Sequence, residues 1–190
     1  MARILIVGGG CRGRLLSAQM VGEGHAVRIT TRRPAGRDAI EATGAECYLG
    51  TPDRLATLRA ALENVTIACW LLGGARGPEE QLRALHSSRL SYFLGQAIDT
   101  TVRGFVYEAG GATVPRGVLA AGERTVRELG ARNAIPVAIL TQDPGDTATW
   151  LAGAHGALEV LLGSRGPALG SRGRGDSRPP RKRRRRYPGS

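Results

Sequence analysis

The sequence has 190 residues, enough for one domain with its own hydrophobic core but not for two full domains. Its formal net charge of +11 is concentrated at one end: ten of the 27 basic residues follow Leu162, and the only acid there is Asp176. That segment therefore carries +9 and the preceding residues carry +2, so the high charge does not indicate that the main body of the protein binds nucleic acid.

The cysteine and hydropathy patterns predict a soluble, cytoplasmic protein. Three cysteines without paired spacing favour neither a disulfide framework nor a zinc site, and three scattered histidines without an acid cluster give no metal site. The apolar run after Arg3 is four residues long and ends in glycines, which is typical of a buried strand rather than a signal peptide. No segment has the roughly 18 uninterrupted apolar residues of a membrane helix.

Strand and helix patterns alternate along the chain, which predicts an α/β fold with a parallel sheet. The strand candidates are rich in Val, Ile and Leu without clean polar alternation, as expected when both faces of a sheet are buried. Right-handed crossovers and the usual doubly wound arrangement predict the strand order 3-2-1-4-5-6. The six predicted strands are Arg3 to Gly8, His25 to Thr31, Ala45 to Leu49, Val65 to Leu72, Gly104 to Glu108 and Pro136 to Leu140.

Several of the intervening helices have recognisable ends. The segment Thr51-Pro52-Asp53 predicts a helix start, with the threonine as cap and the proline at the first helical position. Pro78 followed by two glutamates predicts another start, because acids in a first turn oppose the positive end of the helix dipole. Further helices are predicted from about Val118 to Arg132 and, with Thr147 as cap, after the sixth strand.

The composition changes at residue 163. From there to residue 190 the sequence consists mainly of Gly, Ser, Pro and Arg, and it offers almost nothing apolar to bury. We therefore expect one folded domain over residues 1–162 and a disordered, arginine-rich tail over residues 163–190.

A glycine-rich motif, Gly8-Gly9-Gly10-Cys11-Arg12-Gly13, directly follows the first strand and precedes a helical pattern. It satisfies the G-x-G-x-x-G fingerprint of Rossmann dinucleotide-binding domains in the strand-turn-helix context that the mechanism requires. Gly8 would permit the tight turn, Gly10 the close approach of a pyrophosphate, and Gly13 close packing of the helix on the strand. Amide groups at the helix start, around Cys11 and Arg12, would bind the phosphates. The alternative is a tight turn without a ligand.

The end of the second strand favours NADP over NAD as the cofactor. An acid at this position would bind the ribose 2′-hydroxyl of NAD, whereas the sequence has Arg32 and Arg33, whose guanidinium groups suit a 2′-phosphate. NAD is the alternative, because both arginines could simply face solvent. Asp53 is a candidate contact for the adenine, or only a residue of a helix first turn. Gly73 could let the backbone approach the cofactor, or only end the fourth strand.

Three segments carry a family resemblance: Ile4 to Gly13, Gly24 to Arg28 and Phe105 to Glu108. Together they resemble the extended and atypical short-chain dehydrogenases/reductases, the group that includes NAD-dependent epimerase/dehydratase-like and NmrA-like proteins. The resemblance covers roughly residues 3 to 162. It implies a dinucleotide cofactor and a small-molecule substrate of unknown identity. Members usually continue past the sixth strand into a sizeable substrate-binding region, so here we expect an incomplete or open substrate pocket.

The Tyr-x-x-x-Lys pair of active family members is absent. In that pair the lysine lowers the pKa of the tyrosine, so that the phenol can exchange a proton. The single lysine is Lys182, in the tail, and no tyrosine has a lysine four positions later. We therefore assign no catalytic residue. Tyr107 acting with Glu108 is an alternative, against the simpler interpretation that Tyr107 packs near the cofactor.

Three classes of function stay open from the sequence. The first is a redox enzyme with unusual proton donors, and the second is a cofactor-sensing regulatory module similar to the NmrA-like proteins. The third is a nucleic-acid-associated protein that acts through the basic block Arg181 to Arg186. No folded nucleic-acid module accompanies that block, so a solvated segment without function, or the product of a shifted reading frame, is the favoured interpretation.

Overall fold

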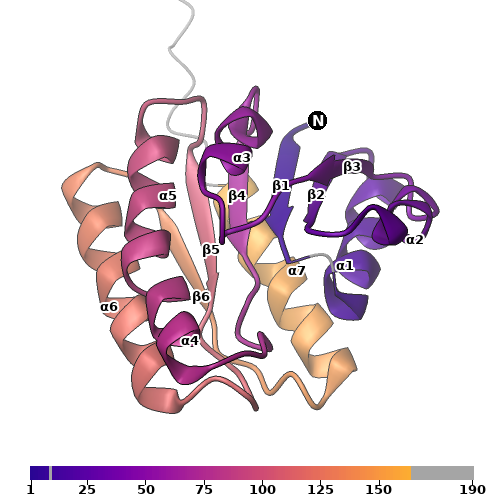
Figure 1. The fold of residues 1–190 in the computed structure, drawn as a ribbon. Helices are drawn as coiled ribbons and strands as arrows, with labels where there is room; N and C mark the ends of the chain where they lie inside the picture. The colour runs from indigo at the N-terminus through magenta and orange to yellow at the C-terminus, as the bar shows by residue number, and fades with distance from the viewer. Residues whose placement is uncertain (9, 164–190) are drawn as a thin grey trace, which may run out of the picture.

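The structure is a computed structural model that describes residues 1–8 and 10–163. Its centre is a six-stranded parallel sheet with the strand order β3-β2-β1-β4-β5-β6 (Figure 1). The predicted α/β class and strand order are therefore confirmed. The strands are β1 (Arg3–Val7), β2 (Ala26–Thr31), β3 (Glu46–Leu49), β4 (Ile67–Trp70), β5 (Gly104–Glu108) and β6 (Val137–Leu140).

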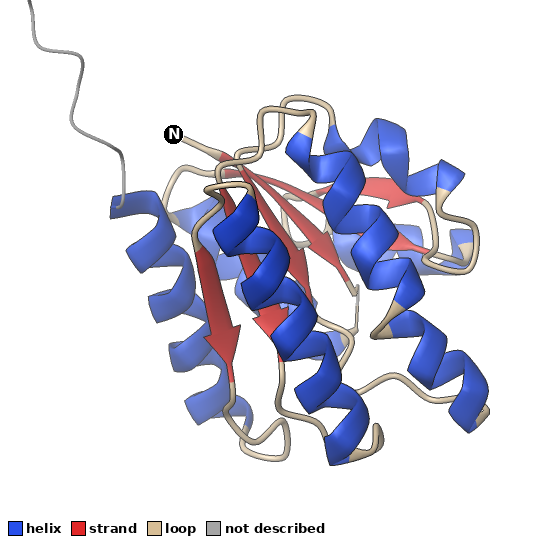
Figure 2. Ribbon diagram, turned by 90° about the vertical axis from the view of Figure 1, so that its left-hand side faces the viewer, coloured by secondary structure: helices blue, strands red, loops and turns tan. Residues whose placement is uncertain are grey.

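Helices cover both faces of the sheet, which explains the uninterrupted apolar strands (Figure 2). In β1, Ile4 and Ile6 belong to an apolar cluster with α1, α2 and α7, whereas Leu5 and Val7 belong to a cluster with the helices of the other face. The α-helices are α1 (Cys11–Gly22), α2 (Arg37–Glu41), α3 (Ala56–Arg59), α4 (Glu79–Leu85), α5 (Ser88–Ile98), α6 (Arg116–Arg132) and α7 (Thr147–Gly163).

Two predicted helix caps are wrong. Thr51 does not start α3: its hydroxyl accepts a hydrogen bond from the amide of Asp53 at 3.3 Å, inside a turn that Thr51 and Arg54 close by a β-bridge. Pro52 suits the second position of such a turn as well as it suits a helix start. Thr147 is the first residue of α7 rather than its cap, because the carboxylate of Asp146 accepts the Thr149 amide at 3.1 Å. The start at Pro78 is confirmed.

Two sequence expectations concern membranes and the tail. In the part of the chain that the structure describes, no helix combines the length and the apolar character needed to span a membrane.

The predicted tail, with Lys182 and the block Arg181 to Arg186, lies outside the described residues apart from Gly163, where α7 ends.

Candidate functional site

The glycine loop after β1 requires glycine at two of its positions. Gly8 has a φ of +129°, and a Cβ atom there would lie 2.3 Å from the carbonyl oxygen of Leu71. A Cβ atom at Gly13 would lie 2.3 Å from the carbonyl oxygen of Gly8, so Gly13 lets α1 start directly against the end of β1. The predicted mechanical roles of both glycines therefore match the backbone geometry.

Gly10 differs, because a Cβ atom there would meet nothing within 4 Å. Gly10 is the N-cap residue of α1, and the backbone amides of the first turn lack intrahelical partners. Open space in front of a helix N-terminus is the geometry in which anionic groups bind. The absence of a side chain at Gly10 therefore keeps this end of α1 accessible.

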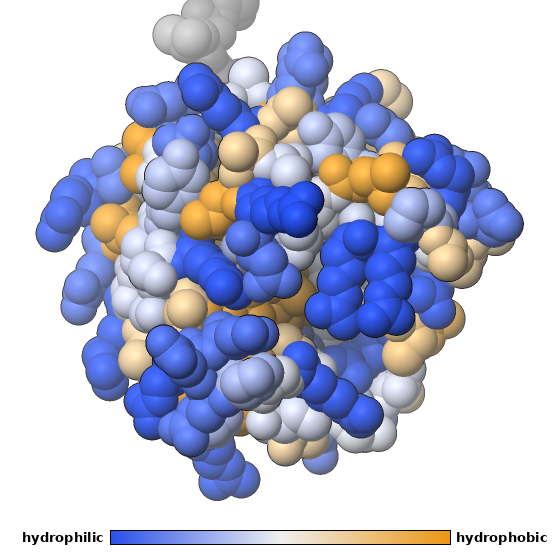
Figure 3. Space-filling model, viewed as in Figure 1, coloured by the Kyte–Doolittle hydropathy of each residue, from blue (hydrophilic) through white to orange (hydrophobic). Residues whose placement is uncertain are grey.

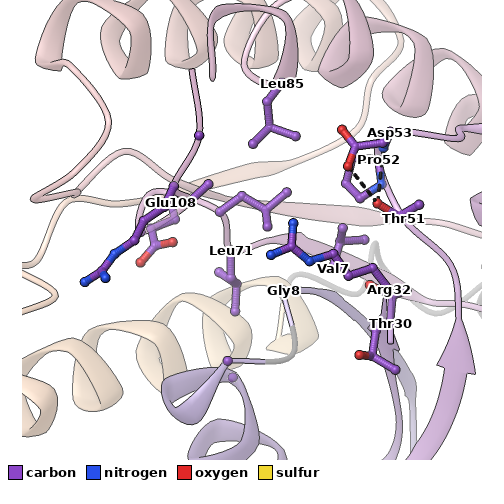
Figure 4. Close-up of a pocket in the computed structure, with 18 of the residues that line it drawn as sticks. Val7, Gly8, Thr30, Arg32, Thr51, Pro52, Asp53, Leu71, Leu85 and Glu108 are labelled. Carbon is purple, nitrogen blue, oxygen red and sulfur yellow. Dashed lines mark hydrogen bonds between the residues drawn. The ribbon is translucent and has the colours of Figure 1, made fainter. Parts of the chain in front are cut away.

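A cavity of about 540 Å³ lies at the carboxyl edge of the sheet, above these amides; we call it the carboxyl-edge cavity (Figure 4). Because β1 lies between β2 and β4, the cavity occupies the point where the strand order reverses, which is where ligands bind in open α/β sheets. Hydrophilic surface surrounds a hollow on this side of the molecule (Figure 3). The lining includes Val7, Gly8, Gly10, Cys11, Arg12, Gly13, Arg32, Asp53, Arg76, Leu82, Leu85, Arg89, Glu108 and Trp150.

Two of the four arginines that line the cavity are neutralised by its two carboxylates. Arg12 pairs with Glu108 at 3.3 Å, and Arg89 pairs with Asp53 at 2.5 Å. The side chains of Arg32 and Arg76 have no hydrogen-bond or ion-pair partner among the described residues. The cavity therefore has a net positive charge from two free guanidinium groups, which suits an anionic ligand.

Glu108 organises one end of the cavity. This side chain is fully buried at the end of β5, and its carboxylate accepts hydrogen bonds from Trp150 Nε1 at 2.8 Å and from the Gly73 amide at 2.7 Å. Arg12 donates to the same carboxylate, lies over the Trp150 ring at 5.2 Å, and donates to the carbonyl of Pro144. Burial raises the pKa of Glu108 even though these donors oppose the shift.

Tyr107 is not a catalytic candidate, in contrast to the alternative drawn from the sequence. Its hydroxyl lies 2.8 Å from Nδ1 of His86 and donates to the carbonyl of Leu119 at 3.2 Å, inside the core on the α4–α6 side of the sheet. Neighbouring side chains of a strand point to opposite faces of the sheet. Because the Glu108 side chain points toward the cavity, the Tyr107 side chain points away from it. Burial also raises the pKa of the Tyr107 phenol, which opposes proton transfer.

The structure brings most of the predicted cofactor-binding residues together. Seven of them line the cavity: Gly8, Gly10, Cys11, Arg12, Gly13, Arg32 and Asp53. Arg33 and Gly73 do not line it: Arg33 is exposed at the start of the turn after β2, and the Gly73 amide is used by Glu108. Among the charged and aromatic lining residues, the sequence did not assign Arg76, Arg89 or Trp150 to the site, and it suggested Glu108 only as a partner of Tyr107. Of these, only Glu108 left a local signal, as an acid at the end of a predicted strand.

The sequence shows no acid cluster near a histidine, but in the structure Glu23 and Glu159 lie beside His155. The atoms of these three side chains that could bind a metal lie within 4.8 Å of one another. The imidazole Nε2 of His155 lies 2.9 Å from a carboxylate oxygen of Glu23, and this contact lowers the pKa of that carboxyl. A hydrogen-bonded pair between α7 and the end of α1 accounts for the arrangement.

The fold and this cavity define the class of the protein as a doubly wound, Rossmann-type α/β domain. No protein-family model and no curated protein matches the sequence. Among solved structures, the protein gox2253 is similar with a TM-score of 0.62 and 20% identity, over 74% of this chain and 51% of that chain.

Two further solved structures carry a cofactor in their descriptions. The UDP-glucuronic acid 4-epimerase of Bacillus cereus, in complex with NAD, has a TM-score of 0.56 and 13% identity, over 73% of this chain and 56% of its own. The triphenylmethane reductase of Citrobacter sp., complexed with NADP(H), has a TM-score of 0.56 and 20% identity, over 73% and 49%. The chain thus spans about half the length of these proteins. The resemblance inferred from the sequence is confirmed at the level of the fold.

Proposed function

We propose that the protein binds a nicotinamide dinucleotide in the carboxyl-edge cavity, with NADP preferred over NAD. The observation that carries the proposal is Arg32, which lines the cavity at the end of β2 and has no partner among the described residues. An acid at this strand end would repel a 2′-phosphate, and the segment Thr30 to Arg33 contains none. A free guanidinium there offers a paired donor set for phosphate oxygens.

The residues present fit such a cofactor along its length. The pyrophosphate would lie on the amides of α1 in the open space at Gly10, and the adenosine half would extend toward Arg32 and the turn that contains Asp53. The other nucleotide would then lie on the β4 side, toward Glu108. When bound, a nicotinamide supplies hydride-transfer chemistry. Arg33 stays a weaker part of the proposal, because it does not line the cavity.

A cofactor-sensing module is a second candidate function, favoured by the position of Tyr107. The phenol lies in the core, and the sequence has no Tyr-x-x-x-Lys pair. The proton transfer that this pair performs in short-chain dehydrogenases/reductases therefore has no corresponding residues here. A protein that binds NADP without turnover could respond to the ratio of its oxidised and reduced forms. Different affinities for NADP and NADPH, without NADPH oxidation, would support this candidate.

Calorimetric titration of the full chain with NADP and with NAD tests the proposal. We expect tighter binding of NADP, and we expect Arg32→Ala to weaken NADP binding about tenfold or more while changing NAD binding little. Arg33→Ala should have a smaller effect. Arg124→Ala, which removes an exposed arginine of α6 outside the cavity, is the matched control. Equal affinity for the two cofactors would contradict the NADP preference, and binding of neither would contradict the proposal as a whole.

A further inference from the structure

The carboxyl-edge cavity has one more free cation than the proposed cofactor contacts use. Two of its four arginines are held by carboxylates, and Arg32 is assigned to the 2′-phosphate. Arg76 also lines the cavity, has no partner among the described residues, and has no role in the proposed cofactor site. A guanidinium group at a ligand cavity recognises carboxylate or phosphate groups in particular.

The topology places Arg76 and Arg32 on opposite sides of the glycine loop. Arg32 follows β2, Arg76 lies in the loop between β4 and α4, and β1 with Gly10 lies between those strands. A dinucleotide bound across this point has one nucleotide on each half of the sheet. With the adenosine half at Arg32, Arg76 lies on the nicotinamide half, where a reacting molecule must be bound.

The cavity wall that follows Arg76 along the chain is apolar. Leu82 and Leu85 of α4 are mostly buried and line the cavity, and Leu85 points toward its centre (Figure 4). Leu72, which lies just after β4, adds a partly buried apolar side chain to the same lining. A cation next to leucines matches a molecule with an acidic group on an apolar body, because each part then has a complementary surface.

We propose that Arg76 is the anion-binding residue of a substrate subsite in this cavity, and that the substrate class is an organic acid with a carboxylate or phosphate on an apolar body. The inference rests on the proposed function, since the cofactor defines which half of the cavity is left for a substrate. It goes beyond the cofactor, because it assigns a ligand class to a residue that a dinucleotide does not need.

Saturation-transfer NMR on the full chain tests the subsite with three probes: benzoate, phenyl phosphate and the neutral benzamide. Each probe is measured with and without saturating NADP, for the wild type, Arg76→Ala and Arg124→Ala, while calorimetry gives the NADP affinity of each variant. We expect one or both anionic probes to bind the NADP-loaded wild type more tightly than benzamide does. Arg76→Ala should weaken that binding about tenfold, with NADP affinity and benzamide binding unchanged. Arg124→Ala should behave as the wild type.

The other outcomes separate the two proposals. Loss of NADP affinity in Arg76→Ala would show that Arg76 holds the cofactor and would overturn the substrate subsite. Equal binding of the anions and benzamide, or anion binding that ignores Arg76, would also overturn it. Anion binding that depends on Arg76 in a protein that binds no NADP would refute the cofactor proposal and keep the anion subsite. The preferred probe distinguishes a carboxylate from a phosphate.

Discussion

Nδ1 of His86 lies 2.8 Å from the hydroxyl oxygen of Tyr107, and both side chains are completely buried. The same hydroxyl is also within hydrogen-bond distance of the carbonyl of Leu119, at 3.2 Å, so a buried imidazole, a phenol and a backbone carbonyl form one hydrogen-bonded group. Neither His86 nor Tyr107 lines the carboxyl-edge cavity, so this contact concerns stability rather than ligand binding.

The His86 contact predicts a stability that falls in acid. Burial lowers the pKa of His86 to about 4, from 6.5 for the unfolded chain. Between these two pKa values the unfolded state binds the His86 proton more readily than the folded state does. The contribution of neutral His86 to the free energy of unfolding is therefore complete above pH 6.5 and is lost as the pH falls toward 4. The loss should approach about 3 kcal/mol. Urea unfolding between pH 7.5 and 4.5 measures it.

His86→Gln isolates this contribution, because it keeps a polar side chain that does not titrate. The variant should be less stable than the wild type at pH 7.5 but should lose less stability on acidification. The raised pKa of Glu108 acts in the opposite direction in both proteins and cancels in the difference. If the free energies of unfolding of the wild type and His86→Gln fell in parallel with pH, His86 would not be the source of the acid sensitivity.

Removing the carboxylate of Glu108 should be strongly destabilising. Glu108→Ala leaves Trp150 Nε1 and the Gly73 amide without their acceptor, and it leaves Arg12 without its counter-charge. We expect a loss of about 3 kcal/mol in the free energy of unfolding, measured with urea at pH 7.5. Asp53→Ala removes the partner of Arg89 at an exposed site, and its cost should stay within about 1 kcal/mol. Equal costs for both variants would contradict the buried network.

Two glycine substitutions should separate folding from cofactor binding. In Gly10→Ala the new methyl group meets no protein atom within 4 Å, so the thermal midpoint should change by at most about 2 °C while NADP binding weakens about tenfold. In Gly13→Ala the methyl group would lie 2.3 Å from a backbone oxygen, so stability should fall along with binding. Thermal unfolding and calorimetry of both variants make the comparison. Unchanged NADP affinity in Gly10→Ala would place the cofactor elsewhere.

Thiol reactivity gives an independent test of where the cofactor lies. Cys11 is exposed and lines the cavity, Cys47 is partly buried, and Cys69 is buried, with a pKa that burial raises. Ellman's reagent should therefore modify one thiol quickly, and saturating NADP should slow that phase. Cys11→Ala should remove the fast phase. A fast phase that survives in Cys11→Ala, or that NADP does not slow, would contradict the assignment.

The sequence predicted the sheet because its strands are apolar on both faces, a signal that each strand carries locally. It also predicted the glycine positions and Arg32, because these follow from the backbone at the end of a single strand. Partners far apart in the chain left no such signal. Arg12 and Glu108 are separated by 96 residues, and only the packed sheet brings them together. The sequence left the role of Tyr107 open, because an apolar strand gives no indication of which face a given side chain takes.

The hydrogen bond from Trp150 to Glu108 makes α7 part of the cavity that begins at Gly8. During synthesis the glycine loop is made first, but the residue that completes the cavity belongs to the last described helix. A nascent chain therefore cannot bind its ligand with full affinity until α7 has been made and has docked. In the mature protein the same linkage should let a ligand bound in the cavity protect the amides of α7 from hydrogen exchange, far along the chain from the glycine loop.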